Sequence, residues 1–375
     1  MKIALVHDYL REAGGAERVL RVLSDMYPSA PIYTAFFRQG TAKRMFSDRK
    51  IVESVWAPVL KLGRTHSYLR FVLPWIWKSI DLRAYDLVIT SCSGYIARGF
   101  RVGDKARVVA YCHTPPKWLY GYETPTGAGG TWWGRAFMWV VGPFVRYFDY
   151  RSADRVNHWI ANSQEVARRI SKFYRKEATV IYPPVEINPK SEILNPKQIQ
   201  NSKFSSNKQD YYLVVSRLVG AKGIEAAIAG ARRARVKLKV VGELVNSDQV
   251  RLDQTKDVEY LGRVDDVSLA RLYAGAKGFI ALARDEDFGM TVVEAMANGT
   301  PVLALRSGGY TETVVEGKTG VFVEHVDVKS VAEGIKKMRK TRWDQAVIKT
   351  SASRFGRERF EQEIRRIVHA RTTRG

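Results

Sequence analysis

The sequence has little cysteine, no long apolar run and a shortage of acidic residues, and each scarcity narrows what the chain can be. Its only cysteines, Cys92 and Cys112, are too few and too far apart for a disulfide framework or a cysteine metal site, which favours a reducing compartment. No stretch approaches the roughly 20 apolar residues that span a bilayer. Residues 1–8 are too short in apolar length for a signal peptide and alternate like a first strand, so we expect a cytosolic protein.

Acidic residues are outnumbered by basic ones. Lys and Arg total 61 against 38 Asp and Glu, which leaves a formal net charge of +23. Such an excess favours a polyanionic surface, either a nucleic acid or the anionic cytoplasmic leaflet of a membrane. Hydrophobic residues make up 45% of the 375 and charged residues 26%, a composition typical of a folded chain that is long enough for two domains.

Short apolar runs alternate with amphipathic segments, which predicts an α/β protein with parallel sheets covered on both faces. A polar stretch rich in Asn, Ser and Lys breaks the alternation, and we interpret it as an interdomain linker. We therefore expect Rossmann-like domains at 1–186 and 211–353, a linker at 187–210, and a C-terminal helical tail at 354–375. The expected strands are 2–6, 51–53, 87–90, 108–111, 159–162 and 179–181 in the first domain, then 211–215, 237–241, 258–261, 279–282, 302–305 and 320–323 in the second.

The tail carries Phe360, Ile364, Ile367 and Val368 on one helical face, so we expect it to dock on the first domain.

Two aromatic segments, residues 64–80 and 121–151, interrupt the α/β alternation. They contain Trp75 with Trp77 and Trp132 with Trp133, flanked by Arg and Lys. One interpretation is a helical subdomain packed on the core. The other is an interfacial membrane segment, with rings at the headgroups and cations on lipid phosphates. The sequence leaves both open.

The most informative motif is Glu286-Asp-Phe-Gly-Met-Thr-Val-Val-Glu294, in which two carboxylates stand eight positions apart. It lies between the expected strand 279–282 and a helix that we expect to start at Thr291. In a doubly wound sheet this is the carboxyl end of a strand, where ligands bind. Between the carboxylates lie Phe288, Gly289, Met290 and Thr291, and the backbone N–H groups of the last three would form an anion site at a helix N-terminus.

Structural alternatives exist for the same motif. Thr291 and Glu294 have the spacing of a capping box, in which the Glu carboxylate only returns to the helix N-terminus. Asp285, Glu286 and Asp287 could also be no more than a solvated acidic loop.

Arg217 and Lys222 follow the expected strand 211–215 on a strand-to-helix loop. A guanidinium and an ammonium at that edge would neutralise a diphosphate and stabilise it as a leaving group. The alternative is two exposed cations in a very basic chain. Their coincidence with the acidic loop favours function.

In the first domain, Gly14 and Gly15 follow the strand 2–6 and allow a ligand to approach the backbone at a helix N-terminus. The G-x-G-x-x-G spacing is absent, which disfavours a nicotinamide enzyme. His113 follows the strand 108–111 and precedes a Pro-Pro turn. A lone His is more often structural, but this position at a strand end suits a substrate contact.

Together these motifs resemble the retaining GT-B glycosyltransferases of family 4. The resemblance covers about residues 2–323, and the nearest subgroup is the mannosyltransferases of O-antigen and exopolysaccharide assembly. It implies a GT-B fold: two Rossmann-like parallel-sheet domains facing a cleft, with the C-terminal helix crossing back to the first domain. The motifs that carry it are Val-His-Asp-Tyr with Gly14-Gly-Ala-Glu17, Tyr-Cys-His113-Thr-Pro-Pro, Ile-Ala-Asn162-Ser, Ile-Tyr-Pro-Pro184-Val, Ser-Arg217 with Lys222-Gly, and Glu286 with Glu294.

The resemblance also implies roles. Arg217 and Lys222 would bind the nucleotide diphosphate, Glu286 the donor-sugar hydroxyls and Glu294 the ribose. The remaining expected contacts are His113 beside the donor sugar, Gly14 and Gly15 along the phosphate and acceptor side, and Gly242, Gly262 and Arg263 near the base.

By the same resemblance the enzyme retains the anomeric configuration and needs neither metal nor cofactor. An Asp-x-Asp metal signature is absent from a suitable place, because Asp285-x-Asp287 lies inside the acidic loop. The expected donor is GDP-mannose or a UDP-hexose, and the expected acceptor is a glycan or a lipid-linked glycan. We expect the enzyme to work as a peripheral protein on the inner face of the cytoplasmic membrane, without nucleic acid.

Two other functions remain open. One is a basic nucleic-acid- or membrane-binding protein on an inactive GT-B scaffold, and the other is a sugar-nucleotide epimerase.

Overall fold

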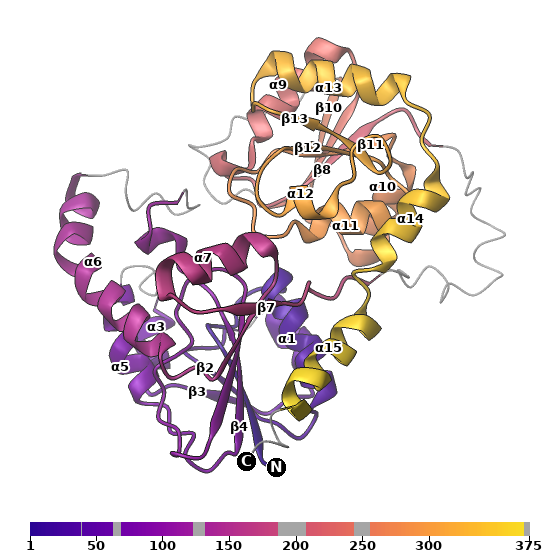
Figure 1. Ribbon diagram of the computed structural model, residues 1–375. Helices are drawn as coiled ribbons and strands as arrows, with labels where there is room; N and C mark the ends of the chain where they lie inside the picture. Colours follow the sequence, from indigo (N-terminus) through magenta and orange to yellow (C-terminus); the bar gives the residue numbers. More distant parts are fainter. Residues whose placement is uncertain (39, 63–68, 123–131, 187–207, 244–255, 371–375) are drawn as a thin grey trace. The chain divides into compact units, whose positions relative to one another are not determined.

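The computed structural model describes residues 1–38, 40–62, 69–122, 132–186, 208–243 and 256–370 (Figure 1). The chain divides into two compact units. The first unit is Met1–Pro184 with Glu358–Gly375, and the second is Val185–Arg357. Each contains one parallel sheet, which confirms the predicted α/β class with two Rossmann-like halves. Most of the predicted linker, 187–207, lies outside the described residues.

The first unit has a seven-stranded sheet in the order β3-β2-β1-β4-β5-β6-β7, and every neighbouring pair is parallel. Its strands are β1 Ile3–His7, β2 Ile32–Thr34, β3 Ile51–Glu53, β4 Leu87–Cys92, β5 Arg107–Cys112, β6 His158–Ala161 and β7 Ala178–Val180. Its helices are α1 Gly15–Met26, α2 Thr41–Met45, α3 Ala57–Leu60, η1 Leu69–Val72, α5 Leu73–Lys78, η2 Lys117–Leu119, α6 Trp132–Ala153, α7 Gln164–Tyr174 and, from the chain end, α15 Arg357–Ala370.

The two faces of this sheet carry separate cores, because successive residues of a strand point to opposite sides. In β1, Ala4 and Val6 join the core under α5 and α7, whereas Leu5 joins the core under α1 and α15. The helix α15 is therefore built into the first unit, as predicted for the tail (Figure 1). Its Phe360, Ile364 and Val368 are buried, Ile367 is partly buried, and the Phe360 ring packs 5.6 Å from that of Tyr111.

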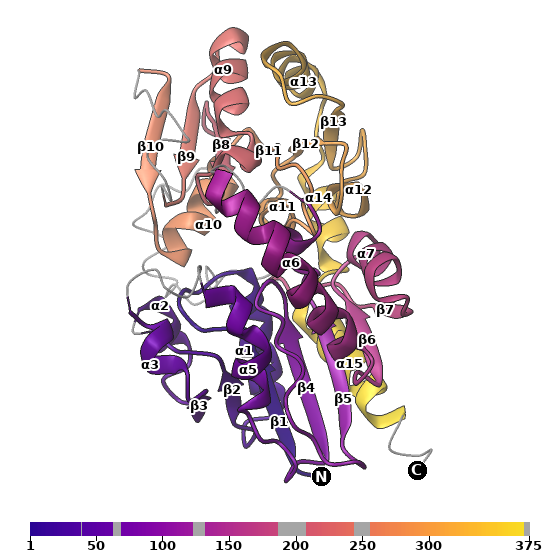
Figure 2. The ribbon, with the colours of Figure 1, turned by 90° about the vertical axis from the view of Figure 1, so that its left-hand side faces the viewer.

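The second unit has a six-stranded parallel sheet in the order β10-β9-β8-β11-β12-β13. The strands are β8 Tyr212–Val215, β9 Leu238–Val241, β10 Val258–Gly262, β11 Gly278–Ala281, β12 Val302–Leu305 and β13 Gly320–Val323. Its helices are η4 Gly220–Lys222, α9 Ile224–Ala234, α10 Asp266–Gly275, α11 Met290–Ala297, α12 Tyr310–Thr313, α13 Val328–Lys340 and α14 Gln345–Ser353. Residues of α9 and α13 share one core with the sheet, and α11 packs on α14 (Figure 2).

The predicted strands match the observed ones closely, but β2 was missed. It has three residues, lies directly after Pro31, and forms between β1 and β3. So short a run has no recognisable period of its own, and its pairing partners define it.

The aromatic segments divide between core and surface. Trp77 is fully buried, and its indole N–H donates to the carbonyl oxygen of Tyr95 at 2.8 Å, so it cannot be a membrane anchor. Trp75 is 50% exposed and Trp139 on α6 is 82% exposed. Trp132 and Trp133 begin α6, but their side chains lie outside what the structure describes.

Within the described part of the chain, no helix has both the length and the apolar character that crossing a membrane requires. Cys92 and Cys112 are buried free thiols that face each other in register on β4 and β5. Burial raises the pKa of Cys112 well above its usual value, which keeps this thiol protonated.

Candidate functional site

The second unit brings Lys222 and Glu286 into direct contact. Strand β8 is followed in the chain by β9 on one side, whereas β11 pairs on its other side, so the chain reverses direction across the sheet at β8 and β11. Ligands of doubly wound sheets bind at such a switch point. Lys222 follows β8 and Glu286 follows β11, and the Lys222 Nζ lies 2.6 Å from the Glu286 Oε2.

Neighbouring groups hold the Glu286 loop in place. The backbone N–H of Arg284 donates to the carbonyl oxygen of Ala221 at 3.1 Å, which ties this loop to the one that carries Lys222. The N–H of Gly309 donates to the Glu286 carbonyl oxygen at 2.9 Å. The Tyr310 hydroxyl donates to the Glu286 Oε2 at 3.5 Å, and burial raises the pKa of Tyr310 well above its usual value. The tyrosine therefore stays a proton donor to the carboxylate.

Glu294 is an internal residue of α11, and the capping-box interpretation is wrong. The helix begins at Met290, one residue before the predicted start, and its N-cap is Gly289. The Glu294 Oε2 instead accepts a hydrogen bond of 2.9 Å from the hydroxyl of Tyr273, a buried residue of α10. The carboxylate is thus held by a side chain from the neighbouring helix.

The loop before α11 depends on a glycine. Gly289 has φ +88°, and a Cβ there would lie 2.7 Å from the Tyr310 ring. Phe288 is 2% exposed and packs with its ring 5.3 Å from that of Phe355, so its side chain supports the loop rather than facing a ligand. Met290 and Thr291 form the first turn of α11 and are partly buried.

The predicted base-side residues cluster with Arg217 at the ends of β8, β9 and β10. A Cβ on Gly242, which has φ +147°, would lie 1.8 Å from the Ser216 carbonyl oxygen, so only glycine permits this approach. The N–H of Gly242 donates to the carbonyl oxygen of Gly262 at 2.8 Å. Arg217 and Arg263 are exposed at this edge.

In the first unit, His113 stands directly after β5 and is only 9% exposed. Its Nε2 lies 2.7 Å from the Ser91 Oγ, which lies 3.0 Å from the His7 Nδ1. The carbonyl oxygen of His113 accepts a hydrogen bond of 2.9 Å from the Asn162 side-chain amide. Burial lowers the pKa of His113 to about 3, with a smaller contribution from the charge of His7, so the ring is neutral at physiological pH.

Gly14 and Gly15 lie at the start of α1, as predicted. Gly14 is the N-cap, and its N–H donates to the Glu17 Oε2 at 3.1 Å. The other Glu17 oxygen lies 3.9 Å from the His7 Nε2. Glu17 is 8% exposed, so this carboxylate is buried between the glycine turn and the histidine.

No site role was predicted from the sequence for His7, Ser91 or Glu17. The position of Ser91 at the carboxyl end of a predicted strand was an available signal. Nothing in the sequence indicates that its hydroxyl joins two histidines 22 and 84 positions away.

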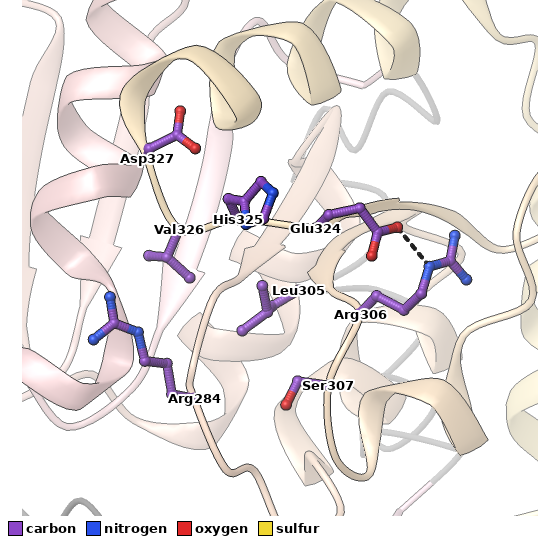
Figure 3. A pocket seen from close by; sticks show the side chains of 8 residues that line it. All are labelled: Arg284, Leu305, Arg306, Ser307, Glu324, His325, Val326 and Asp327. Carbon is purple, nitrogen blue, oxygen red and sulfur yellow. Dashed lines mark hydrogen bonds and ion pairs between the residues drawn. The ribbon is translucent and has the colours of Figure 1, made fainter.

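A pocket of about 490 Å³ lies further along the same edge of the second sheet, beyond the ends of β11, β12 and β13. Figure 3 shows its lining, in which Arg306 pairs with Glu324. Arg217, Lys222, Glu286 and Glu294 do not line it. The lining residues are Arg284, Leu305, Arg306, Ser307, Glu324, His325, Val326 and Asp327.

Among the described residues, no three His, Cys, Asp or Glu side chains gather as metal ligands. Metal independence stays a prediction.

Two family models match successive parts of the chain. Residues 13–188 match the Glycosyltransferase Family 4 model, and residues 196–355 match the model of Glycosyl transferases group 1. The boundary between the two matches falls near the end of the first unit.

Among curated relatives, the chain is 31% identical to "Glycogen synthase" of Mycobacterium tuberculosis over 220 residues, which cover 54% of this chain and 51% of that protein. It is 29% identical to "GDP-mannose-dependent alpha-mannosyltransferase" of Corynebacterium glutamicum, over 31% of this chain and 28% of the relative. The matched segment thus spans about half the length of the Mycobacterium relative and a smaller part of the Corynebacterium relative.

Among solved structures, Anabaena Alr3699/HepE in complex with UDP-glucose superposes with a TM-score of 0.67 at 20% identity, over 99% of this chain and 100% of that chain. At this identity the likeness shows the fold. Since the two family models follow one another along the two observed units, the chain belongs to the GT-B glycosyltransferases, with a family 4 N-terminal domain and a group 1 C-terminal domain.

Proposed function

We propose that this chain is a retaining hexosyltransferase that moves a hexose, preferably mannose from GDP-mannose, to a glycan or lipid-linked acceptor. UDP-hexoses are the next donors to consider. The observation that carries the proposal is the contact between Lys222 and Glu286 at the switch point of the second sheet. It supports the proposal because Lys222 would neutralise a diphosphate and Glu286 would bind sugar hydroxyls beside it.

The chemistry follows from where charge develops. As the nucleotide diphosphate leaves, negative charge grows on its oxygens and the anomeric carbon becomes positive. Lys222, Arg217 and the N-terminus of α11 would stabilise the departing diphosphate. The acceptor hydroxyl then attacks from the face that the diphosphate leaves, and a diphosphate oxygen takes its proton. Retention therefore requires no enzyme nucleophile.

The base and sugar are proposed from the relatives. The Corynebacterium relative is named as GDP-mannose-dependent, whereas the Anabaena structure contains UDP-glucose. Both are nucleotide diphosphate sugars, so the same cations would serve either. We propose that Glu294 binds the ribose and that Gly242, Gly262 and Arg263 lie near the base.

We propose that an anionic membrane surface holds the enzyme near its acceptor. Four exposed aromatic residues of α5 and α6 form what we call the aromatic face: Trp75, Trp139, Phe144 and Tyr147. The rings of Trp75 and Phe144 lie 5.7 Å apart, so the face continues from one helix to the next. Arg146 and Arg151 are exposed on the same helix. Rings at headgroup level with cations beside lipid phosphates suit such a surface.

A thermal-shift panel tests the donor, because a ligand that binds only the folded chain raises its unfolding temperature. The probes are GDP, GDP-mannose, UDP and UDP-glucose, each with and without EDTA. We expect GDP and GDP-mannose to stabilise the wild-type chain most, with little effect of the chelator. Glu294→Ala should reduce that stabilisation, and Glu312→Ala, which removes another partly buried carboxylate, on α12, is its matched control.

Other results would contradict the proposal. Retention on heparin without a shift from any sugar nucleotide would favour a binding protein on an inactive scaffold. Release of free nucleotide and an epimerised sugar without an acceptor would indicate an epimerase. Strict dependence on magnesium or manganese would contradict the metal-free mechanism.

Sedimentation with phosphatidylglycerol vesicles tests the membrane part. We expect salt-sensitive binding, to which each basic residue near the surface adds about 1 kcal/mol. Trp139→Ser with Phe144→Ser should release the protein, whereas the exposed Val267→Ser of the second unit should not. A wild-type chain that stays in solution at low salt would contradict this location.

A further inference from the structure

A continuous chain of polar contacts leads from α1 to His113. The Glu17 Oε1 lies 3.9 Å from the His7 Nε2, and the His7 Nδ1 lies 3.0 Å from the Ser91 Oγ. The Ser91 Oγ in turn lies 2.7 Å from the His113 Nε2. All four side chains are at least nine-tenths buried, so their proton positions are decided by one another.

The hydroxyl of Ser91 couples the two histidine tautomers. A hydroxyl carries one proton, so it can donate to only one of the two rings and must accept from the other. If Ser91 donates to His7, then His113 carries its proton on Nε2. If Ser91 donates to His113, then His113 carries its proton on Nδ1. The state of one ring therefore determines the state of the other.

Glu17 selects between these two states. Its carboxylate is anchored by the N–H of Gly14 at 3.1 Å and can only accept hydrogen bonds. The distance of 3.9 Å to the His7 Nε2 exceeds a hydrogen bond, but charge acts strongly over that range in buried surroundings. A bare His7 nitrogen would face the carboxylate with another lone pair, whereas an N–H is attracted to it.

A proton on the His7 Nε2 fixes the directions of the other hydrogen bonds. The His7 Nδ1 is bare and accepts from Ser91, and the Ser91 oxygen accepts from the His113 Nε2–H. This leaves the His113 Nδ1 as a hydrogen-bond acceptor. A bare nitrogen binds a donor such as a sugar hydroxyl and disfavours a phosphate oxygen, which also only accepts.

We propose that Glu17, acting through His7 and Ser91, fixes the tautomer of His113 so that its Nδ1 accepts a hydrogen bond from a hydroxyl of the sugar substrate. The ligand contact rests on the proposed function. Glu17, His7 and Ser91 are positioning residues in this arrangement, since they act through the His113 ring. His113 recognises a hydroxyl group and does not bind the diphosphate.

Nitrogen-15 NMR on the histidine-labelled full chain at pH 8 tests the tautomer without any substrate, because protonated and bare ring nitrogens resonate far apart. The chain has 6 histidines, and His113→Gln and His7→Gln identify the two signals of interest. We expect His113 and His7 both to carry the proton on Nε2. A proton on the His113 Nδ1, or a doubly protonated His7, would overturn the inference.

Variants test the selection by Glu17. Glu17→Gln offers His7 either an oxygen or an NH₂ group, so we expect a detectable fraction of His113 with the proton on Nδ1. Glu17→Asp keeps the charge and should keep the wild-type tautomer. The matched control is Glu225→Gln, which also removes a first-turn carboxylate but lies on α9 of the second unit. An unchanged His113 tautomer in Glu17→Gln would overturn the selection.

Kinetics with GDP-mannose supply a second readout. Ser91→Ala breaks the link to His7, and loss of one oriented hydrogen bond should lower kcat about tenfold with KM for the donor nearly unchanged. Ser54→Ala removes another buried hydroxyl, which donates to the Ala35 carbonyl oxygen at 2.7 Å, and should leave kcat as it is. A kcat for Ser91→Ala equal to wild type would contradict the proposal.

The two readouts separate the inference from the proposed function. The expected tautomer in a chain that transfers no sugar would contradict only the proposed function. The other tautomer in an active transferase would contradict only this inference.

Discussion

The two units carry polar sites of opposite construction. In the first unit, His7, Ser91 and His113 stand at strand ends, are almost fully buried and bind one another. In the second unit, Lys222 ends the short helix η4 and Glu286 lies on a loop, and their side chains are 26% and 18% exposed. One site is thus assembled by a rigid sheet and the other by loops that glycines shape.

The two sites thus differ in how their side chains are held before a ligand binds. The buried site orients one histidine through a network that a single lost partner would disturb. The loop site keeps its opposite charges paired with each other until a ligand competes for them. Removal of a side chain should therefore alter the proton positions of the histidines in the first unit. In the second unit it should alter the transfer rate or the affinity for the nucleotide. The following predictions test that comparison, beginning with the largest expected effect.

Glu286→Ala should abolish transfer while the fold stays intact. The carboxylate is 18% exposed and binds Lys222 and the Tyr310 hydroxyl, so its loss should cost about 1–3 kcal/mol, too little to unfold a domain. Transfer from GDP-mannose and the unfolding temperature should be measured on the same preparation. Near-normal turnover would remove Glu286 from the site.

Lys222→Ala and Arg217→Ala should each lower the rate by about a hundredfold or more, as expected for groups that stabilise a departing diphosphate. Lys222→Arg keeps the charge and should recover part of the loss. Lys318→Ala, a cation beyond α12, is the control and should turn over normally. If Lys222→Ala and Arg217→Ala turn over as fast as Lys318→Ala, the two cations do not stabilise the departing diphosphate.

Low pH should destabilise the first unit through His113. Because its pKa is lowered to about 3, the unfolded chain binds more protons than the folded chain between about pH 6.5 and 3. The free energy of unfolding should thus fall as pH drops through this window, by at most about 1.4 kcal/mol per pH unit from this residue. The free energy of unfolding should be measured by urea titration at several pH values. Plotted against pH, it should have a shallower slope in His113→Gln than in wild type. An identical slope in wild type and His113→Gln would contradict the burial effect.

Glu294→Ala should weaken GDP binding about tenfold, the smallest of these effects. It also leaves the buried Tyr273 hydroxyl without its acceptor, which costs about 1 kcal/mol of stability. Tyr273→Phe removes the same hydrogen bond without touching the nucleotide. Calorimetric titration with GDP should therefore separate the two variants, and equal affinities would show that Glu294 is only structural.

Much of the fold could be predicted because parallel strands are local apolar runs. β3, β12 and β13 have the predicted bounds, and the docking of α15 follows from one apolar helical face. The loop glycines could also be recognised, because each lies between a predicted strand and a predicted helix.

Long-range polar contacts could not be predicted in this way. Glu294 has capping-box spacing, yet Tyr273 of another helix binds it. Trp75 and Trp77 are near neighbours in an aromatic segment, yet one is half exposed and the other is fully buried. Residue spacing describes only positions that are close in the sequence. The partner of Glu294 and the burial of each Trp depend instead on which distant element packs beside them.

The sequence by itself determined the alternation of strands and helices, the basic charge and the two motifs at strand ends, because hydrophobic period and turn residues act over a few positions. Only the tertiary structure decided that Lys222 meets Glu286 and that Ser91 joins His7 to His113. Those contacts arise when parallel pairing brings the carboxyl ends of separate strands to one edge of a sheet, and that register is set by the packing of the whole unit.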